Sequence, residues 1–161
     1  MLVLAVRGQG CWLKPLDGVG DFRQLRVSQV RHPSEARVLR SFEKGHTNAY
    51  ALGQIMQAMA SNAEPVLMDS QAKYAVLAGG GGDLLFRLLS SEQPGYREKI
   101  WDQAAGSIVV EEAGGRVTDL AGRPLNFAAG RTLLHNRGVL ASNGLLHDVA
   151  LDAVRRVVRV E

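Results

Sequence analysis

Short apolar runs separated by turn residues at the start of the chain predict a β-hairpin. Residues 2–6 read LVLAV, Gly-Gln-Gly at 8–10 supplies a turn, and residues 11–13 form the return strand. An isolated hairpin is only marginally stable, so we expect this one to belong to a larger sheet. A turn at 15–20 and a short strand at 24–27 follow it.

The rest of the chain alternates helical and strand-like patterns. Residues 48–60 carry apolar side chains at spacings of three and four, the period of an amphipathic helix. Three further helices are predicted at 71–78, 100–113 and 145–160. The remaining short segments are strands at 38–42, 65–68, 83–89, 116–119 and 138–141, and a Pro-opened helical turn at 32–36. This order predicts an α/β fold with a mixed β-sheet flanked by helices, in a single domain covering residues 1–161.

Four consecutive glycines at 79–82 are interpreted as a helix end. A phosphate-binding P-loop needs a strand before the glycines and Gly-Lys-Ser/Thr after them. Here the glycines follow a predicted helix and lack that ending.

Composition narrows the class of protein. The 161 residues are 46% hydrophobic and 22% charged, which suits one globular core. A net charge of +3 with only 6% aromatic residues does not favour a nucleic-acid groove, but it is compatible with small anionic substrates. The single cysteine, Cys11, excludes an intrachain disulfide and a cysteine-based zinc site, and it reads as a strand residue.

The first residues, MLVLAVRG, lack a charged leader, and their apolar run is too short for a signal peptide or a membrane span. We therefore expect no membrane partner and a cytoplasmic location, with an organelle matrix as the alternative.

Asp102 is the first candidate for chemistry, because it lies in the first turn of the predicted helix 100–113. A carboxylate there sits beside unpaired backbone N–H groups, so a metal cation and a phosphate could both be held nearby. The alternative is that Asp102 merely caps the helix.

Three residues could bind an anion. Ser70 and Lys73 are three apart near the start of one predicted helix, and Arg87 lies on the next strand. The alternative is that each is an ordinary solvated surface residue. The four histidines show no metal-ligand spacing. Glu111 and Glu112 are too far along their helix to share an ion with Asp102.

Several motifs resemble one family. The run WDQAAG at 101–106, followed by EAGG at 112–115 and Thr118-Asp119, resembles a motif of the inositol monophosphatase superfamily of metal-dependent, lithium-sensitive phosphatases. Four further pieces are similar to the 3'(2'),5'-bisphosphate nucleotidase branch: SFE at 41–43 with His46, MDSQAKY at 68–74, YREKIWD at 96–102 and GVLASNG at 138–144.

The resemblance implies roles for individual residues. Asp102 resembles a Mg²⁺ ligand, whereas Ser70, Lys73 and Arg87 resemble residues that grip the phosphate and sugar of a nucleotide. His46 resembles a residue that lies against the nucleotide. The implied reaction is magnesium-dependent hydrolysis of adenosine 3',5'-bisphosphate to AMP and phosphate, within nucleotide metabolism and sulfur assimilation.

The resemblance also implies a missing part, because it matches the C-terminal domain of the family fold. Family members carry, upstream, a Glu-bearing helix and an Asp-Pro-Ile-Asp-Gly-Thr motif with most metal ligands and the water-activating residues. Neither is found here, and PLDG at 15–18 is a partial look-alike that we interpret as a turn. We expect the C-terminal, substrate-binding half of a phosphatase without its metal-binding half, inactive or incomplete alone.

Two alternatives stay open. One is a non-catalytic nucleotide-binding or interaction module, and the other is a fragment of an inositol-phosphate phosphatase, which DSQAKY at 69–74 disfavours. In every case the open edge of the sheet is expected to be apolar and to be covered by a second polypeptide or by another copy of the chain.

Overall fold

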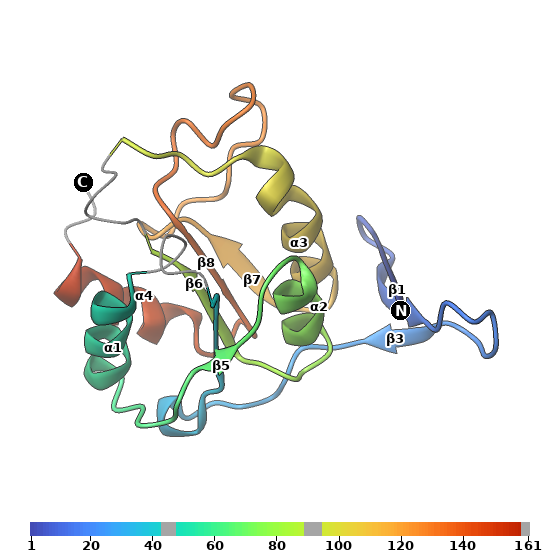
Figure 1. Ribbon diagram of the computed structural model, residues 1–161, viewed down its shortest axis with the longest axis horizontal. Coiled ribbons are helices and arrows are strands. Elements are labelled where there is room, and N and C mark those ends of the chain that lie inside the picture. Colours follow the sequence, from blue (N-terminus) through green and yellow to red (C-terminus); the bar gives the residue numbers. More distant parts are fainter. Residues whose placement is uncertain (43–47, 89–94, 159–161) are drawn as a thin grey trace.

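The computed structural model of the protein describes residues 1–42, 48–88 and 95–158, and it contains a larger and a smaller β-sheet (Figure 1). The elements are, in chain order, β1 (Leu2–Val6), β2 (Gly10–Lys14), β3 (Arg23–Leu25), the 3-10 helix η1 (Pro33–Glu35), β4 (Val38–Arg40), α1 (Ala49–Ala58), β5 (Val66–Leu67), α2 (Ala72–Ala78), β6 (Leu84–Arg87), α3 (Ile100–Glu112), β7 (Arg116–Thr118), β8 (Val139–Ser142) and α4 (His147–Val157).

The larger sheet is mixed, as the sequence predicts. Its strand order is β5-β4-β6-β8-β7, with β4 parallel to both β5 and β6, and β8 antiparallel to β6 and β7. The carboxyl ends of β4, β5 and β6 therefore meet at one edge of the sheet. In open α/β sheets, ligands bind outside the carboxyl ends of such strands.

Side chains alternate between the two faces of this sheet. Leu84 and Phe86 of β6 join the core that includes residues of α1 and α4, whereas Leu85 between them joins the core that includes residues of α2 and α3. Figure 1 shows these two pairs of helices on opposite sides of the sheet. This alternation of apolar side chains lets one pair of helices pack on each face of the sheet, which gives three layers.

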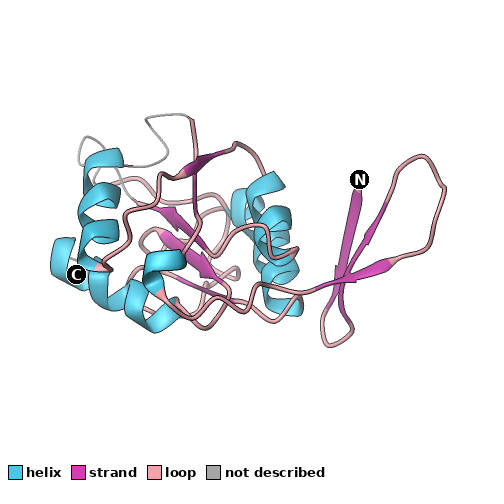
Figure 2. Cartoon of the chain, turned by 90° about the horizontal axis from the view of Figure 1, so that it is seen from below, coloured by secondary structure: helices cyan, strands magenta, loops and turns pink. Residues whose placement is uncertain are grey.

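The hairpin forms a sheet of its own, which the sequence does not predict. Strands β1, β2 and β3 pair antiparallel in that order, and they project away from the rest of the molecule (Figures 1 and 2). The reason is the extended segment after β3, which leads away to η1 and β4 instead of adding the hairpin to the larger sheet.

One helix anchors the small sheet. The backbone N–H groups of Gly8 and Gly10 each donate to the Glu112 carboxylate at 2.9 Å, and Arg7 pairs with Glu111 at 2.6 Å. These two acids close the hairpin onto the last turn of α3, so they do not share an ion with Asp102.

The outer face of β1 carries exposed apolar side chains. Leu2, Leu4 and Val6 are 46%, 45% and 40% exposed, and β1 has no strand on its outer edge among the described residues. Such an edge is a template for pairing with another chain.

Helix ends follow local signals. Asn48 caps α1 by accepting from the N–H of Ala51 at 3.0 Å. The glycine run ends α2, because Gly79 is its C-cap and Gly80 adopts the left-handed φ of 73°. The prediction for 79–82 is confirmed. In the part of the chain that the structure describes, no helix combines the length and apolarity needed to span a membrane.

Candidate functional site

A small cavity lies where the carboxyl ends of the parallel strands meet the starts of two helices. Its volume is about 140 Å³. It is lined by Ser70, Gln71, Lys73, Tyr74, Arg87, Asp102 and Gln103. Ser70 follows β5, Arg87 ends β6, and Asp102 lies in the first turn of α3. The parallel pairing through β4 is what places the first two at the same edge.

The cavity brings together four of the five residues singled out from the sequence. Ser70, Lys73, Arg87 and Asp102 all line it. His46, the fifth, lies outside the described residues. Two cationic side chains and a carboxylate therefore share one small space.

The sequence suggested that Ser70 lies at the start of a helix. In the structure Ser70 precedes the helix, because α2 begins only at Ala72. It instead has a left-handed φ of 64°, and its hydroxyl accepts a hydrogen bond from the N–H of Ala72 at 3.3 Å. A non-glycine residue in this region costs on the order of 1 kcal/mol, and such strain clusters at ligand sites.

The surface interpretation is wrong for Lys73, which is only 4% exposed. A buried ammonium needs compensation from nearby polar or charged groups. Arg87 is also largely buried, with its side chain 11% exposed. The two cations are therefore part of the interior wall of the site.

A buried chain of polar groups lies behind Arg87. Its Nη2 donates to Glu98 at 3.0 Å, the Gln103 amide donates to the same carboxylate oxygen at 2.6 Å, and the Tyr74 hydroxyl donates to the Gln103 carbonyl. Burial by itself lowers the pKa of Arg87, but the charge and hydrogen bond of Glu98 outweigh it and raise that pKa. Burial raises the pKa of the Tyr74 phenol, so Tyr74 remains a donor.

Sequence reasoning assigned no role to Glu98, Gln103 or Tyr74. All three fall within the motif segments 68–74, 96–102 and 101–106, but nothing in their spacing indicates that they meet. The signal that links them is burial of polar residues, which only the structure provides.

Asp102 is not the helix cap, because Lys99 occupies the N-cap position of α3. The backbone carbonyl of Asp102 accepts a 2.6 Å hydrogen bond from the side-chain amide of Gln71. This contact fixes the first turn of α3 against the start of α2, while the Asp102 side chain lines the cavity.

The donors around Asp102 do not make a complete metal site. Among residues 1–42, 48–88 and 95–158, no three or more His, Cys, Asp or Glu side chains gather closely enough to hold an ion. Magnesium takes near-octahedral oxygen ligands, of which a protein usually supplies one or two carboxylates. Asp102 fits the role of one ligand and cannot assemble a site by itself.

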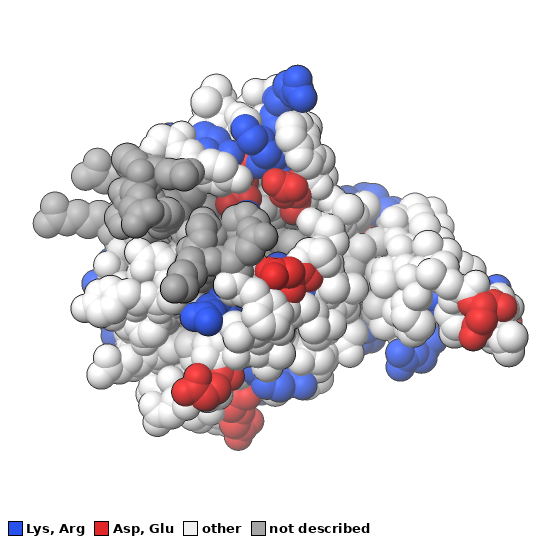
Figure 3. All heavy atoms as spheres, viewed as in Figure 1, with Lys and Arg blue, Asp and Glu red and all other residues white. Residues whose placement is uncertain are grey.

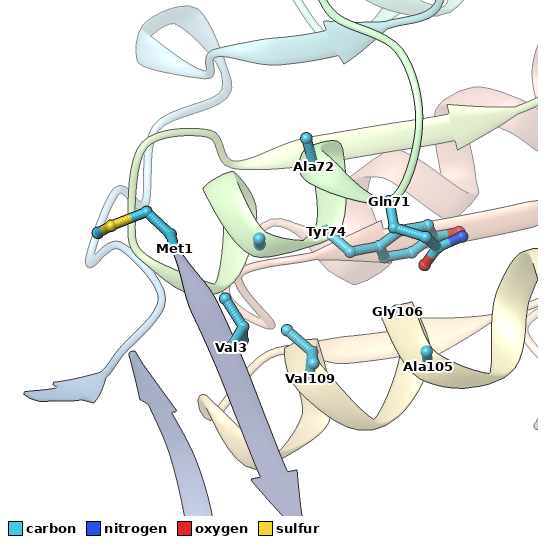
Figure 4. A pocket seen from close by; sticks show the side chains of 9 residues that line it. Met1, Val3, Gln71, Ala72, Tyr74, Ala105, Gly106 and Val109 are labelled. Carbon is cyan, nitrogen blue, oxygen red and sulfur yellow. The ribbon is translucent and has the colours of Figure 1, made fainter. Parts of the chain in front are cut away.

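A second, more apolar groove adjoins the first. It has a volume of about 280 Å³ and is lined by Met1, Val3, Gln71, Ala72, Tyr74, Ala75, Ala105, Gly106 and Val109. Figure 4 shows β1 on one side of it and α2 and α3 on the other. Gln71 and Tyr74 line both spaces.

The start of α3 also lies beside a basic loop. Lys99 pairs with Thr132 in an isolated bridge, and the guanidinium of Arg131 lies 5.5 Å from the centre of the Trp101 ring. Figure 3, viewed as in Figure 1, shows Lys and Arg side chains gathered at the top of the molecule. They lie over the loops that precede α3 and β8.

A profile of the Inositol monophosphatase family matches residues 1–159 of the chain. A 3'(2'),5'-bisphosphate nucleotidase of Oryza sativa is 40% identical over 158 residues, which are 98% of this chain and 43% of that protein. The protein of the same name from Schizosaccharomyces pombe is 37% identical over 158 residues, 98% of this chain and 44% of its own length. The chain thus spans less than half the length of these relatives.

Solved structures share the fold. An inositol monophosphatase from Anabaena matches with a TM-score of 0.67 and 24% identity, covering 96% of this chain and 54% of that one. An inositol monophosphatase from Thermotoga maritima matches with a TM-score of 0.68 and 25% identity, covering 97% and 52%. The predicted mixed α/β architecture is confirmed.

Proposed function

The chain belongs to the inositol monophosphatase family, and from that premise we propose that it forms the substrate-binding part of a phosphatase acting on adenosine 3',5'-bisphosphate. The reaction is hydrolysis of the 3'-phosphomonoester to AMP and phosphate.

The observation that carries this proposal is the meeting of Lys73, Arg87 and Asp102 around one cavity of about 140 Å³. Arginine offers paired donors to phosphate oxygens and lysine a point charge. A carboxylate in the same space suits a cation that accompanies the phosphate. Ser70 adds a hydroxyl to the lining of the same cavity.

The choice of substrate rests on the relatives. Proteins named as 3'(2'),5'-bisphosphate nucleotidases are 34–40% identical over nearly the whole chain. The Anabaena and Thermotoga structures named as inositol monophosphatases are 24% and 25% identical. We therefore favour a nucleotide bisphosphate over an inositol phosphate.

We further propose that this chain is the substrate-binding half and needs partners for catalysis. Magnesium, with Asp102 as one ligand, would neutralise charge on the phosphate and supply an activated water. The remaining ligands and the water-activating group would come from a segment outside these 161 residues. Lithium sensitivity and a place in sulfur assimilation belong to the same proposal.

One observation favours a second function, a nucleotide-binding module without catalysis. In the described residues a single carboxylate faces the cavity, and no cluster of three or more potential metal ligands exists there. The two functions predict the same binding and different turnover.

The deciding experiment measures phosphate release from adenosine 3',5'-bisphosphate with magnesium, with and without lithium, alongside calorimetric titration of the same nucleotide. We expect binding with little or no turnover by this chain alone. Robust magnesium-dependent turnover that Asp102→Asn abolishes would contradict the incomplete-site proposal. Asp152→Asn, on the exposed face of α4, is the matched control. Absence of binding by the wild-type chain would remove the nucleotide proposal itself.

A further inference from the structure

Arg87 occupies an unusual position for a phosphate-binding arginine. One of its terminal nitrogens, Nη2, donates to Glu98 at 3.0 Å, and the Tyr96 side chain also interacts with Arg87. Its Nε is buried and has no hydrogen-bond partner in the described part of the chain. Buried donors are nearly always paired, so an orphaned one marks a place for an absent ligand or water.

Glu98 is held from two sides. Its side chain is 5% exposed and accepts from Gln103 as well as from Arg87. Its backbone carbonyl accepts from the N–H of Leu133 at 2.8 Å, which ties it to the loop before β8. The carboxylate therefore has little freedom to follow Arg87 if the arginine moves.

The hydrogen bonds that connect Tyr74, Gln103 and Glu98 all run in the same direction. The Tyr74 hydroxyl is a donor, so the Gln103 side chain must receive it through its carbonyl and turn its NH₂ group toward Glu98. The amide NH₂ group thereby holds the Glu98 carboxylate in place. Each member fixes the next, from α2 through α3 to the end of β6.

A second consequence concerns Asp102, which lines the same small cavity as Arg87. Arginine readily forms bidentate pairs with carboxylates. The ion pair that the structure shows joins Arg87 to Glu98 at 3.0 Å, and within residues 1–42, 48–88 and 95–158 no ion pair joins Arg87 to Asp102. Glu98, and not Asp102, is therefore the carboxylate that holds the guanidinium.

We propose that Glu98 is a positioning residue, which together with Gln103 and Tyr74 orients Arg87 so that its guanidinium meets an anionic oxygen of the nucleotide. This inference rests on the proposed function for its substrate. Glu98 itself does not touch the substrate and acts through Arg87.

The test combines two measurements on the full chain. The first is the ¹⁵N–¹H signal of the Arg87 Nε–H group without any ligand, which reports whether the guanidinium is ordered. The second is calorimetric titration with adenosine 3',5'-bisphosphate. The variants are Glu98→Gln and Tyr74→Phe, with Asp148→Asn as control because it removes the carboxylate of an exposed ion pair to Arg116.

Glu98→Gln should broaden the Arg87 signal and weaken nucleotide binding by roughly 10- to 100-fold, as for loss of one partner of a buried charge pair. Tyr74→Phe should weaken binding by about 3- to 10-fold, the worth of one hydrogen bond. Asp148→Asn should change neither quantity. In an Arg87→Met background, Glu98→Gln should cause less than about a twofold further loss, because coupled residues are not additive.

If Glu98→Gln weakens nucleotide binding as much in the Arg87→Met background as in the wild-type chain, the inference is overturned, since Glu98 would then act independently of Arg87. An unchanged Arg87 signal in Glu98→Gln would overturn it as well. If Glu98→Gln does not fold, Tyr74→Phe decides instead, because wild-type affinity and a sharp Arg87 signal in that variant would also overturn the inference. A wild-type chain that binds no nucleotide refutes the proposed function, while the Arg87 signal still decides whether Glu98 positions the arginine.

Discussion

Gly106 on α3 lies directly against the aromatic ring of Tyr74 on α2. A β-carbon at position 106 would come within 2.4 Å of two ring atoms and 2.8 Å of the Gln71 side-chain oxygen. The contact lets the two helices approach closely, and it holds Tyr74 where its hydroxyl reaches Gln103. The lack of a side chain at Gly106 is therefore required for the hydrogen bond between Tyr74 and Gln103 behind the cavity.

Replacing Gly106 with Ala should destabilise the protein by about 2–3 kcal/mol, because the extra methyl overpacks a buried contact. Urea unfolding followed by circular dichroism measures this. Gly53→Ala is the matched control, since Gly53 also lies in a helix but has open space around its Cα. That change should stabilise the protein by about 0.5–1 kcal/mol. Equal effects of the two changes would contradict the packing argument.

A buried histidine should make stability depend on pH. His147 is fully buried and is bonded to the hydroxyls of Thr118 at 2.9 Å and Ser142 at 2.8 Å. Burial, aided by the charge of Arg116 and opposed by that of Asp148, lowers its pKa from 6.5 to about 4. The unfolded chain therefore binds the proton first as the pH falls.

The stability that the neutral imidazole contributes is complete above about pH 6.5 and is lost between there and about pH 4. Its size is about 3 kcal/mol, at 1.36 kcal/mol per unit of pKa. Urea midpoints at pH 7 and pH 5 measure the part of this loss that occurs above pH 5, about 2 kcal/mol. His147→Gln should flatten this pH dependence, whereas His135→Gln, at an exposed position, should retain it. An unchanged slope in His147→Gln would refute the assignment.

Loss of the buried lysine should weaken nucleotide binding. Lys73→Ala removes a cation from the wall of the cavity, and we expect adenosine 3',5'-bisphosphate to bind roughly 10- to 100-fold more weakly. Ser70→Ala should have a smaller effect of about 3- to 10-fold. Calorimetry measures both, with Lys14→Ala in the small sheet as control. Wild-type affinity in both Ser70→Ala and Lys73→Ala would remove these residues from the site.

The apolar outer face of β1 should promote self-association. Leu4→Lys places a charge among Leu2, Leu4 and Val6, and we expect it to shift sedimentation-velocity profiles toward the monomer. Tyr50→Lys removes another exposed apolar side chain, on α1 at the opposite end of the molecule in Figure 1. It should leave the profile unchanged, and an equal effect of both variants would contradict a specific role for β1.

The elements that the sequence predicts correctly depend on local signals. The apolar run of β1, the 3–4 spacing of α1 and the glycines after α2 and α3 each mark an element within a few residues. The separate small sheet could not be predicted, because strand partners are chosen by long-range contacts and not by the strands' own patterns. The helix predicted at 145–160 begins two residues later, at His147, after the turn made by Gly144.

For the candidate site, the resemblance of motifs pointed to Ser70, Lys73, Arg87 and Asp102, which line the same cavity. Glu98 and Gln103 were missed for a physical reason. Polar residues next to and within a helix usually face solvent, yet both are buried here. Their burial depends on the loop before β8 pairing with the segment before α3, a contact between residues more than thirty positions apart.

Helix α3 connects the small sheet to the cavity. Glu112 at its last turn grips the backbone of the hairpin, and Asp102 at its first turn lines the cavity. Glu112 lies ten positions after Asp102, a rise of about 15 Å along continuous helix. A polypeptide that adds a strand to β1 would therefore be held, through one continuous helix, at a fixed distance from the Asp102 carboxylate.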